Sequence, residues 1–104
     1  MSVTYIIGFT VRQGQEARFL SLLNGVLDAM RVEETYINAT LHRDPERPGR
    51  YLLHETWADH DDVVNVQLAR PYRAEWHAAL PELLEGEREI SVWEPLRSDS
   101  ARNF

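Results

Sequence analysis

Apolar side chains recur at every odd position of residues 3–11, which is the period of a half-buried β-strand. Over residues 15–32 the apolar positions are separated instead by three and four, as in an amphipathic α-helix. Strand-type patterns return over residues 35–43 and residues 50–57. Residues 44–49 lie between these two strands and contain two prolines and a glycine, so we expect a hairpin with a six-residue turn.

The second half of the chain predicts two helical segments and a final strand. Residues 59–70 have a helical pattern, with Asp59 as the N-cap. Pro71 suits the first turn of a second helical segment, and Pro81 is expected to kink or end that segment. Residues 90–96 again have the character of a strand.

These elements follow the order strand, helix, strand, strand, helix, strand, which predicts an α+β fold of the ferredoxin-like, split βαβ type. We expect one domain over residues 1–96 and a polar C-terminal tail over residues 97–104. In such a fold the helices cover one face of an antiparallel sheet. The opposite face would carry Ile6, Leu52 and Trp93, and an apolar surface of that kind usually marks an interface. The sequence therefore predicts a homodimer in which two sheets pack face to face.

Composition narrows the functional classes. The 104 residues include no cysteine, which excludes disulfides, thiol catalysis and thiolate metal sites. The formal net charge is −6 and basic residues do not cluster, so nucleic-acid binding is not expected. No segment approaches the roughly 20 apolar residues of a membrane span, and the N-terminus lacks the basic region of a signal peptide. We therefore expect a cytoplasmic protein without a membrane partner. The acids of residues 59–62 diverge around a helix start, so no metal site is expected there.

Residues 55–59 join the third strand to a helix, and they carry the candidate chemistry. Strand parity places Leu53 and Trp57 on one face, and helical spacing places Tyr72 and Trp76 on another. The reversal of the chain after Trp57 brings these two faces together. The expected result is a small-molecule pocket with aromatic walls, which suits a planar phenolic ligand. The alternative for the same aromatic side chains is ordinary core packing.

Three polar residues are candidates for the chemistry of that pocket. His77 is a candidate general base because histidine titrates near neutral pH, although a surface position on the helix is the simpler interpretation. Gln67 is the other polar side chain that we expect near the ligand. Glu55 lies on the pocket face as well, and a buried carboxylate there needs a cationic partner such as Arg31 or Arg70. For Glu55, structural pairing is favoured over catalysis.

Residues 3–96 resemble the antibiotic biosynthesis monooxygenase family, small dimeric α/β-barrel proteins that include quinol monooxygenases. The resemblance is carried by short segments in a fixed order. They are the strand over residues 3–11, Gly14, Arg31-Val32-Glu33-Glu34, residues 55–59, Pro71, Trp76 and Leu80-Pro81. Four residues depart from the usual pattern: Gln67 lies nearest to where many members have a histidine, Tyr72-Arg73 replaces His-Phe, and Thr35 replaces a glycine.

The resemblance implies oxidation of a small quinol or phenol by molecular oxygen, with no metal and no flavin as cofactor. An ionised phenol can itself reduce oxygen, so the protein supplies a dry pocket, orientation and hydrogen bonds to developing negative charge. Trp57 would donate its indole N–H to an oxygenated intermediate. Heme-degrading relatives carry an axial histidine in the helix of His77, which makes heme binding an alternative. A function of a different class is a non-catalytic ligand-binding or regulatory domain on the same scaffold.

Overall fold

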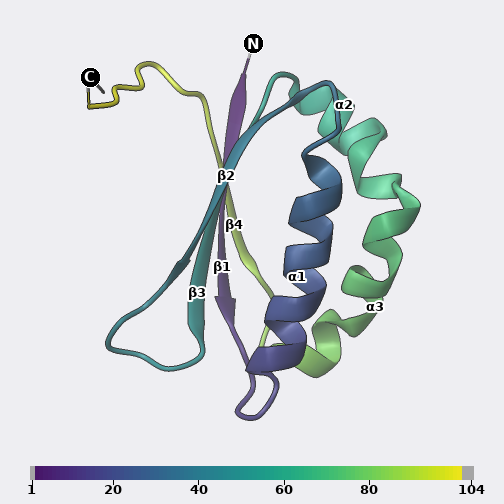
Figure 1. The fold of residues 1–104 in the computed structure, drawn as a ribbon, viewed down its shortest axis with the longest axis vertical. Coiled ribbons are helices and arrows are strands. Elements are labelled where there is room, and N and C mark those ends of the chain that lie inside the picture. Colours follow the sequence, from purple (N-terminus) through teal and green to yellow (C-terminus); the bar gives the residue numbers. More distant parts are fainter. Residues whose placement is uncertain (1, 102–104) are drawn as a thin grey trace.

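The order of strands and helices in the computed structural model, which describes residues 2–101, is the order that the sequence predicts. Four strands form one antiparallel sheet in the order β2-β3-β1-β4 (Figure 1). Their bounds are Val3–Thr10 for β1, Tyr36–Arg43 for β2, Arg50–Trp57 for β3 and Glu89–Trp93 for β4. This arrangement confirms the ferredoxin-like fold.

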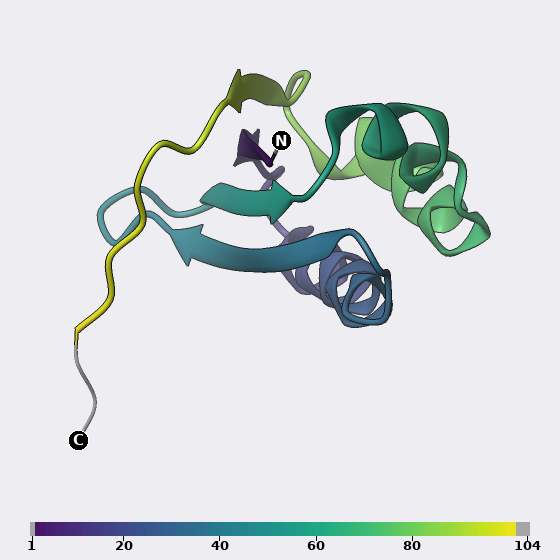
Figure 2. The same cartoon turned by 90° about the horizontal axis from the view of Figure 1, so that it is seen from above.

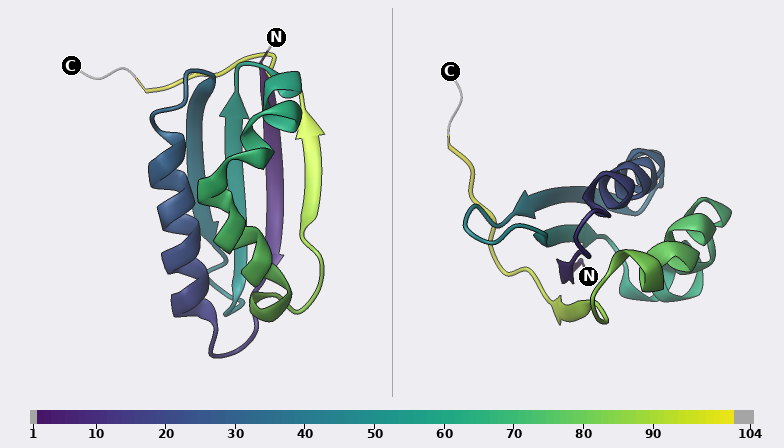
Figure 3. Two further views of the ribbon diagram at one scale, coloured as in Figure 1. Left: turned by 90° about the vertical axis from the view of Figure 1, so that its right-hand side faces the viewer. Right: turned by 90° about the horizontal axis from the view of Figure 1, so that it is seen from below.

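The helices lie together on one face of the sheet, and the other face carries no helix (Figures 2 and 3). They are α1 over Glu16–Met30, α2 over His60–Asn65 and α3 over Ala74–Leu83. An aromatic cluster joins the two layers at the core. The Phe9 ring of β1 lies 5.1 Å from Phe19 of α1 and 5.8 Å from Trp76 of α3, measured between ring centroids. Within residues 2–101, none of the helices has the length and apolar character that a membrane span requires.

Strand register decides which side chains face the helices. Ile7 of β1 pairs with Leu53 of β3 and with Ile90 of β4, so these three side chains share the helical side of the sheet. Leu52 and Trp93 face the opposite side, where they are 43% and 58% exposed. The apolar outer face that the sequence predicts is therefore present, and the dimer remains a prediction.

The hairpin turn between β2 and β3 is set by a side chain and a glycine. The Asp44 carboxylate accepts hydrogen bonds from the backbone N–H groups of Glu46 and Arg47, at 2.9 and 3.2 Å. Gly49 has φ of 85°, and a Cβ at this position would lie 2.9 Å from the carbonyl oxygen of Val11. Both the conformation and the space exclude a side chain at Gly49.

The prediction of one continuous helix over residues 59–70 is wrong. Asp59 is the N-cap as predicted, with its carboxylate 2.9 Å from the N–H of Asp61, but α2 ends at Asn65. Two 3₁₀ turns follow, η1 over Gln67–Ala69 and η2 over Pro71–Arg73. Arg70 has ψ of 133° because the ring of Pro71 disfavours the helical conformation in the residue before it.

The remaining bounds agree with the sequence patterns to within a few residues. Pro71 begins η2, and Pro81 lies inside α3 two residues before its end. The last strand ends at Trp93 rather than at residue 96. Residues 97–101 of the expected tail have no regular structure, and residues 102–104 lie outside the described residues.

Candidate functional site

A cavity of about 150 Å³ lies between the helical face of the sheet and the helices. Strands β1, β3 and β4 line it on the sheet side, and α1, α2, α3 and the two turns at Leu68 and Arg73 line it on the helical side. Most of its lining is apolar, and charged side chains reach it at three positions. The lining residues are Tyr5, Ile7, Phe9, Leu23, Val26, Leu27, Met30, Leu53, Glu55, Val63, Val64, Leu68, Arg73, Trp76, Arg88 and Ile90. Such a small apolar space with a few convergent polar groups is typical of a ligand site.

Glu55 is the buried acid of this cavity. It is 6% exposed, and the indole N–H of Trp57 donates a hydrogen bond to its carboxylate at 3.3 Å. Burial raises the pKa of Glu55, while the charges of Arg73 and Arg88 and the hydrogen bond from Trp57 oppose the rise. The sequence-based expectation that Arg31 or Arg70 pairs with Glu55 is wrong. The cations whose charges lower the pKa of Glu55 are Arg73 and Arg88.

Arg73 is the second charged group at the cavity, and it is as deeply buried as Glu55. Its guanidinium carbon lies 5.9 Å from the ring centroid of Trp57 and 5.7 Å from that of Tyr72. Within the described residues, its Nε and Nη2 atoms are buried and have no hydrogen-bond partner. A guanidinium is always charged in a protein, so these two buried donors lack the acceptor that such groups normally have.

Arg88 and Tyr5 complete the polar lining. Arg88 lies just before β4, and burial lowers its pKa while the charge of Glu55 raises it. The Tyr5 hydroxyl lies 2.6 Å from Nδ1 of His60, whose imidazole is exposed. Burial and the charges of Glu55 and Asp59 raise the pKa of Tyr5, so its hydroxyl stays neutral at physiological pH.

The structure brings together only part of the predicted site. Leu53 and Trp76 line the cavity, as expected. The side chain of Trp57 is fully buried against Tyr36, with 5.5 Å between ring centroids, and its N–H is used by Glu55. Trp57 is therefore absent from the cavity lining and is hydrogen-bonded to Glu55, which belongs to that lining.

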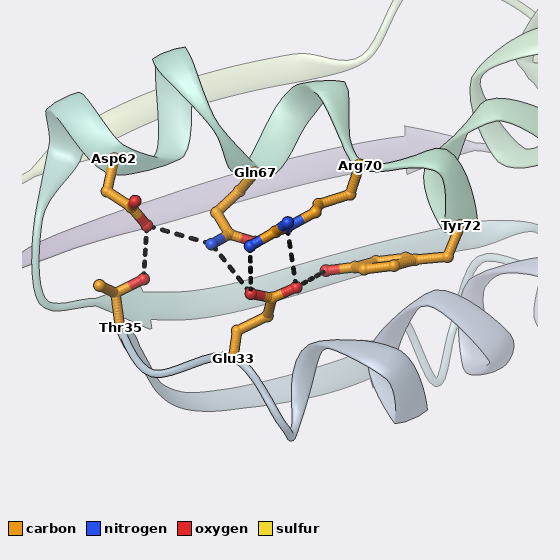
Figure 4. Close-up of polar contacts among 6 residues, drawn as sticks. All are labelled: Glu33, Thr35, Asp62, Gln67, Arg70 and Tyr72. Atoms are coloured by element: carbon orange, nitrogen blue, oxygen red, sulfur yellow. Dashed lines mark hydrogen bonds and ion pairs between the residues drawn. The ribbon is translucent and has the colours of Figure 1, made fainter.

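Gln67 and Tyr72 belong to a separate polar network beside the cavity (Figure 4). Glu33, which follows α1, is its centre. Its carboxylate accepts hydrogen bonds from Gln67 at 3.2 Å and Tyr72 at 3.3 Å, and it forms an ion pair with Arg70 at 3.1 Å. Gln67 also donates to Asp62 at 3.1 Å. This network fixes the segment from α2 to η2 over the end of α1.

His77 lines a second, more open hollow beside the C-terminal half of α3. That hollow shares Arg88 and Ile90 with the cavity, so the two spaces are neighbours. Burial and the charges of Arg88 and Arg73 lower the pKa of His77, so the imidazole is neutral at pH 7. Among residues 2–101, no group of three or more His, Asp and Glu side chains is placed to hold a metal ion.

Sequence reasoning missed Arg73, Arg88 and Tyr5. Two signals were present for the arginines. Arg73 lies three positions before Trp76, which is helical spacing for one face, and Arg88 lies two positions before Ile90, which is strand parity. Arginine side chains are usually exposed, so neither arginine was expected to line a buried cavity.

Comparison with known proteins places the chain among monooxygenase relatives. Residues 2–79 match the family described as antibiotic biosynthesis monooxygenase. The chain is 32% identical over 93 residues to a protein of Pestalotiopsis microspora whose name reads "putative monooxygenase", and the alignment covers 88% of this chain and 78% of that protein.

Solved structures show the same fold. Rv0793 from Mycobacterium tuberculosis superposes with a TM-score of 0.85 at 21% identity, over 96% of this chain and 100% of that one. SnoaB from Streptomyces nogalater, described as a cofactor-independent oxygenase, superposes with a TM-score of 0.79 at 25% identity, over 93% of this chain and 95% of that one.

Proposed function

Because this chain belongs to the antibiotic biosynthesis monooxygenase family, we propose that it oxidises a small quinol or phenol with molecular oxygen, without metal or flavin. The observation that carries the proposal is the buried carboxylate of Glu55, which lies in an apolar cavity with the guanidinium groups of Arg73 and Arg88. The description of SnoaB as a cofactor-independent oxygenase supports the same chemistry.

Glu55 is the general base of the proposed reaction. Burial raises its pKa toward the pKa of a phenol, which makes it a stronger base than an exposed carboxylate. The N–H of Trp57 fixes the orientation of the carboxylate, so Trp57 is a positioning residue. The ring of the substrate would lie between Leu53 of the sheet and Trp76 of α3, which are both buried and apolar.

The two guanidinium groups stabilise the anions that form. Once Glu55 has removed the phenolic proton, the substrate anion transfers two electrons to oxygen. One oxygen atom bonds to a ring carbon, and two further electrons from the substrate break the O–O bond. The other oxygen atom then leaves as water with two protons from the substrate, and the ring is left as a quinone. Arg73 and Arg88 line the same cavity, so their positive charges stabilise the negative charge at each stage, and in apolar surroundings this electrostatic interaction is stronger than in water.

The other residues expected at the site have supporting roles in this proposal. Gln67 and Tyr72 hold the segment that carries Arg73 through their hydrogen bonds to Glu33. His77, neutral at pH 7, is the second candidate base, from the neighbouring hollow.

A homodimer is part of the proposal. The outer sheet face carries Leu52 and Trp93 with about half of each side chain exposed, and apolar surface of this kind is typical of an interface. A domain of 104 residues has a thin core, and burying this face would add to its stability.

Oxygen consumption with a panel of substituted hydroquinones tests the proposed function. Glu55→Gln keeps the size of the side chain and removes the base, so turnover should fall about 10²–10⁴-fold. Glu82→Gln is the matched control, because Glu82 is exposed and pairs with Arg18 away from the cavity. His77→Gln should reduce turnover less than Glu55→Gln.

The outcomes separate the alternatives. If hydroquinones bind and no oxygen is consumed, the chain is a ligand-binding domain on this scaffold. If Glu55→Gln retains full turnover while His77→Gln loses it, the base is His77 and the assignment of Glu55 fails.

A further inference from the structure

The charged groups of the cavity do not balance. Glu55 supplies one negative charge, and Arg73 and Arg88 supply two positive charges. Tyr5, which also lines the cavity, is neutral because burial and nearby acids raise its pKa. The lining therefore carries one excess positive charge, and a ligand with one negative charge would bring the sum to zero.

Arg73 shows where that negative charge belongs. The exposed cations Arg18 and Arg70 have carboxylate partners, Glu82 at 2.7 Å and Glu33 at 3.1 Å. Arg73 is only 6% exposed, yet its Nε and Nη2 atoms have no acceptor within the described residues. Buried donors without partners are costly, and a guanidinium presents its N–H groups in a fork that matches a carboxylate.

The volume of the cavity limits the size of the ligand. An apolar cavity of about 150 Å³, the volume found here, is known from another protein to hold one benzene molecule. The lining that includes Arg73 also includes Leu53 and Trp76, whose apolar side chains suit the faces of a ring.

We propose that the cavity selects a single aromatic ring that carries a carboxylate, with the carboxylate bound by Arg73 and the ring between Leu53 and Trp76. Glu55 then faces a phenolic hydroxyl elsewhere on the ring, and Arg88 remains for the anion formed there. This inference takes its reactive site from the proposed function and names the substrate class, a hydroxybenzoate. It depends on binding, so it is testable without turnover.

The probes are 4-hydroxybenzoate and 4-hydroxybenzamide, which have nearly the same size and differ in charge. Binding is measured by calorimetry and by quenching of tryptophan fluorescence. We expect the native protein to bind the carboxylate about tenfold to a hundredfold more tightly than the amide, the range for hydrogen bonds to charged groups. The preference should persist at about 0.5 M salt, because buried charges are screened much less than exposed ones.

Arg73→Gln should remove the preference, so that both probes bind equally. Arg73→Lys keeps the charge and loses the fork, so it should restore part of the preference. Arg18→Gln, at an exposed ion pair, is the control and should leave the preference unchanged. Circular dichroism checks that each variant is folded. If Arg73→Gln does not fold, the ratio in the native protein and in Arg73→Lys decides.

Equal affinity for the two probes in the native protein, or a preference that survives in folded Arg73→Gln, would overturn the inference. Its failure differs from failure of the proposed function. Consumption of oxygen with hydroquinone but no preference for the carboxylate would leave the proposed function standing alone. Tight binding of 4-hydroxybenzoate without any oxygen consumption by hydroquinones would leave only the inference standing.

Discussion

Replacing Trp57 by phenylalanine tests how the buried indole and the Glu55 carboxylate depend on each other. The side chain of Trp57 is fully buried, and phenylalanine lacks two of its carbon atoms and the N–H. Loss of two buried carbons costs roughly 1.6 kcal/mol. The hydrogen bond contributes about 2 kcal/mol when Glu55 is ionised and about 1 kcal/mol when it is protonated. The free energy of unfolding should therefore fall by about 3.6 kcal/mol at high pH and about 2.6 kcal/mol at low pH.

The sign of the pH dependence follows from the pKa of Glu55. Because burial raises this pKa in the folded state, the fold is most stable when Glu55 is protonated and loses stability as pH rises through the folded pKa. The hydrogen bond from the Trp57 N–H lowers the pKa of Glu55. Its loss in Trp57→Phe therefore raises this pKa further and enlarges the loss of stability with rising pH. Urea unfolding at pH 4 and pH 9 measures it. Trp76→Phe removes a similar buried area beside Phe9 and is the control, with no change in its cost between the two pH values. An equal cost for Trp57→Phe at both pH values would refute the coupling.

Further predictions concern Glu55, Leu52 and Glu33. Glu55→Gln should raise the free energy of unfolding at pH 8 and have less effect at pH 4, because the amide is not ionised; urea unfolding that shows a loss at both pH values would contradict the raised pKa of Glu55. Leu52→Asp should prevent the proposed dimer from forming, because it places a charge on the outer sheet face, and sedimentation of the native protein as a monomer would reject that dimer. Glu33→Gln replaces one carboxylate oxygen by an NH2 group and removes the charge that pairs with Arg70, which should cost about 1–3 kcal/mol and lower the thermal midpoint. An unchanged midpoint would show that the network adds no stability.

The fold was predictable because both of its periods are clear in the sequence. The odd residues of β1 and β3 face the helices as their alternation requires, and Phe19 and Leu23 of α1 are buried at helical spacing. The break after α2 was not predictable from apolar spacing. It depends on a buried amide, Gln67, whose partners Glu33 and Asp62 lie on other segments of the chain.

The sequence predicts which face of the sheet carries the site, but it does not predict where on that face the cavity lies. Parity placed Leu53 and Trp57 on the helical side, but it does not say which neighbours each would meet. Trp57 pairs with Val3 and with Tyr36 at one end of the sheet, and the aromatic ring of Tyr36 covers it. The cavity forms elsewhere on that face, where β1 is central and brings Ile7 between Leu53 and Ile90. That neighbourhood follows from the order of strands in the sheet, which alternation along one strand cannot give.

The exposed position of β4 has a consequence for motion. In the single chain every residue of Glu89–Trp93 is exposed, including Ile90 and Val92 on the helical side that the proposed dimer does not cover, and within residues 2–101 the strand pairs only with β1. A segment with so little buried surface detaches at a lower free energy than global unfolding. Because Arg88 and Ile90 belong to the cavity lining, detachment of this one strand opens the site while α1 and the other strands stay folded. Amide hydrogens of β4 should therefore exchange faster than those of β3, and a ligand in the cavity should slow their exchange.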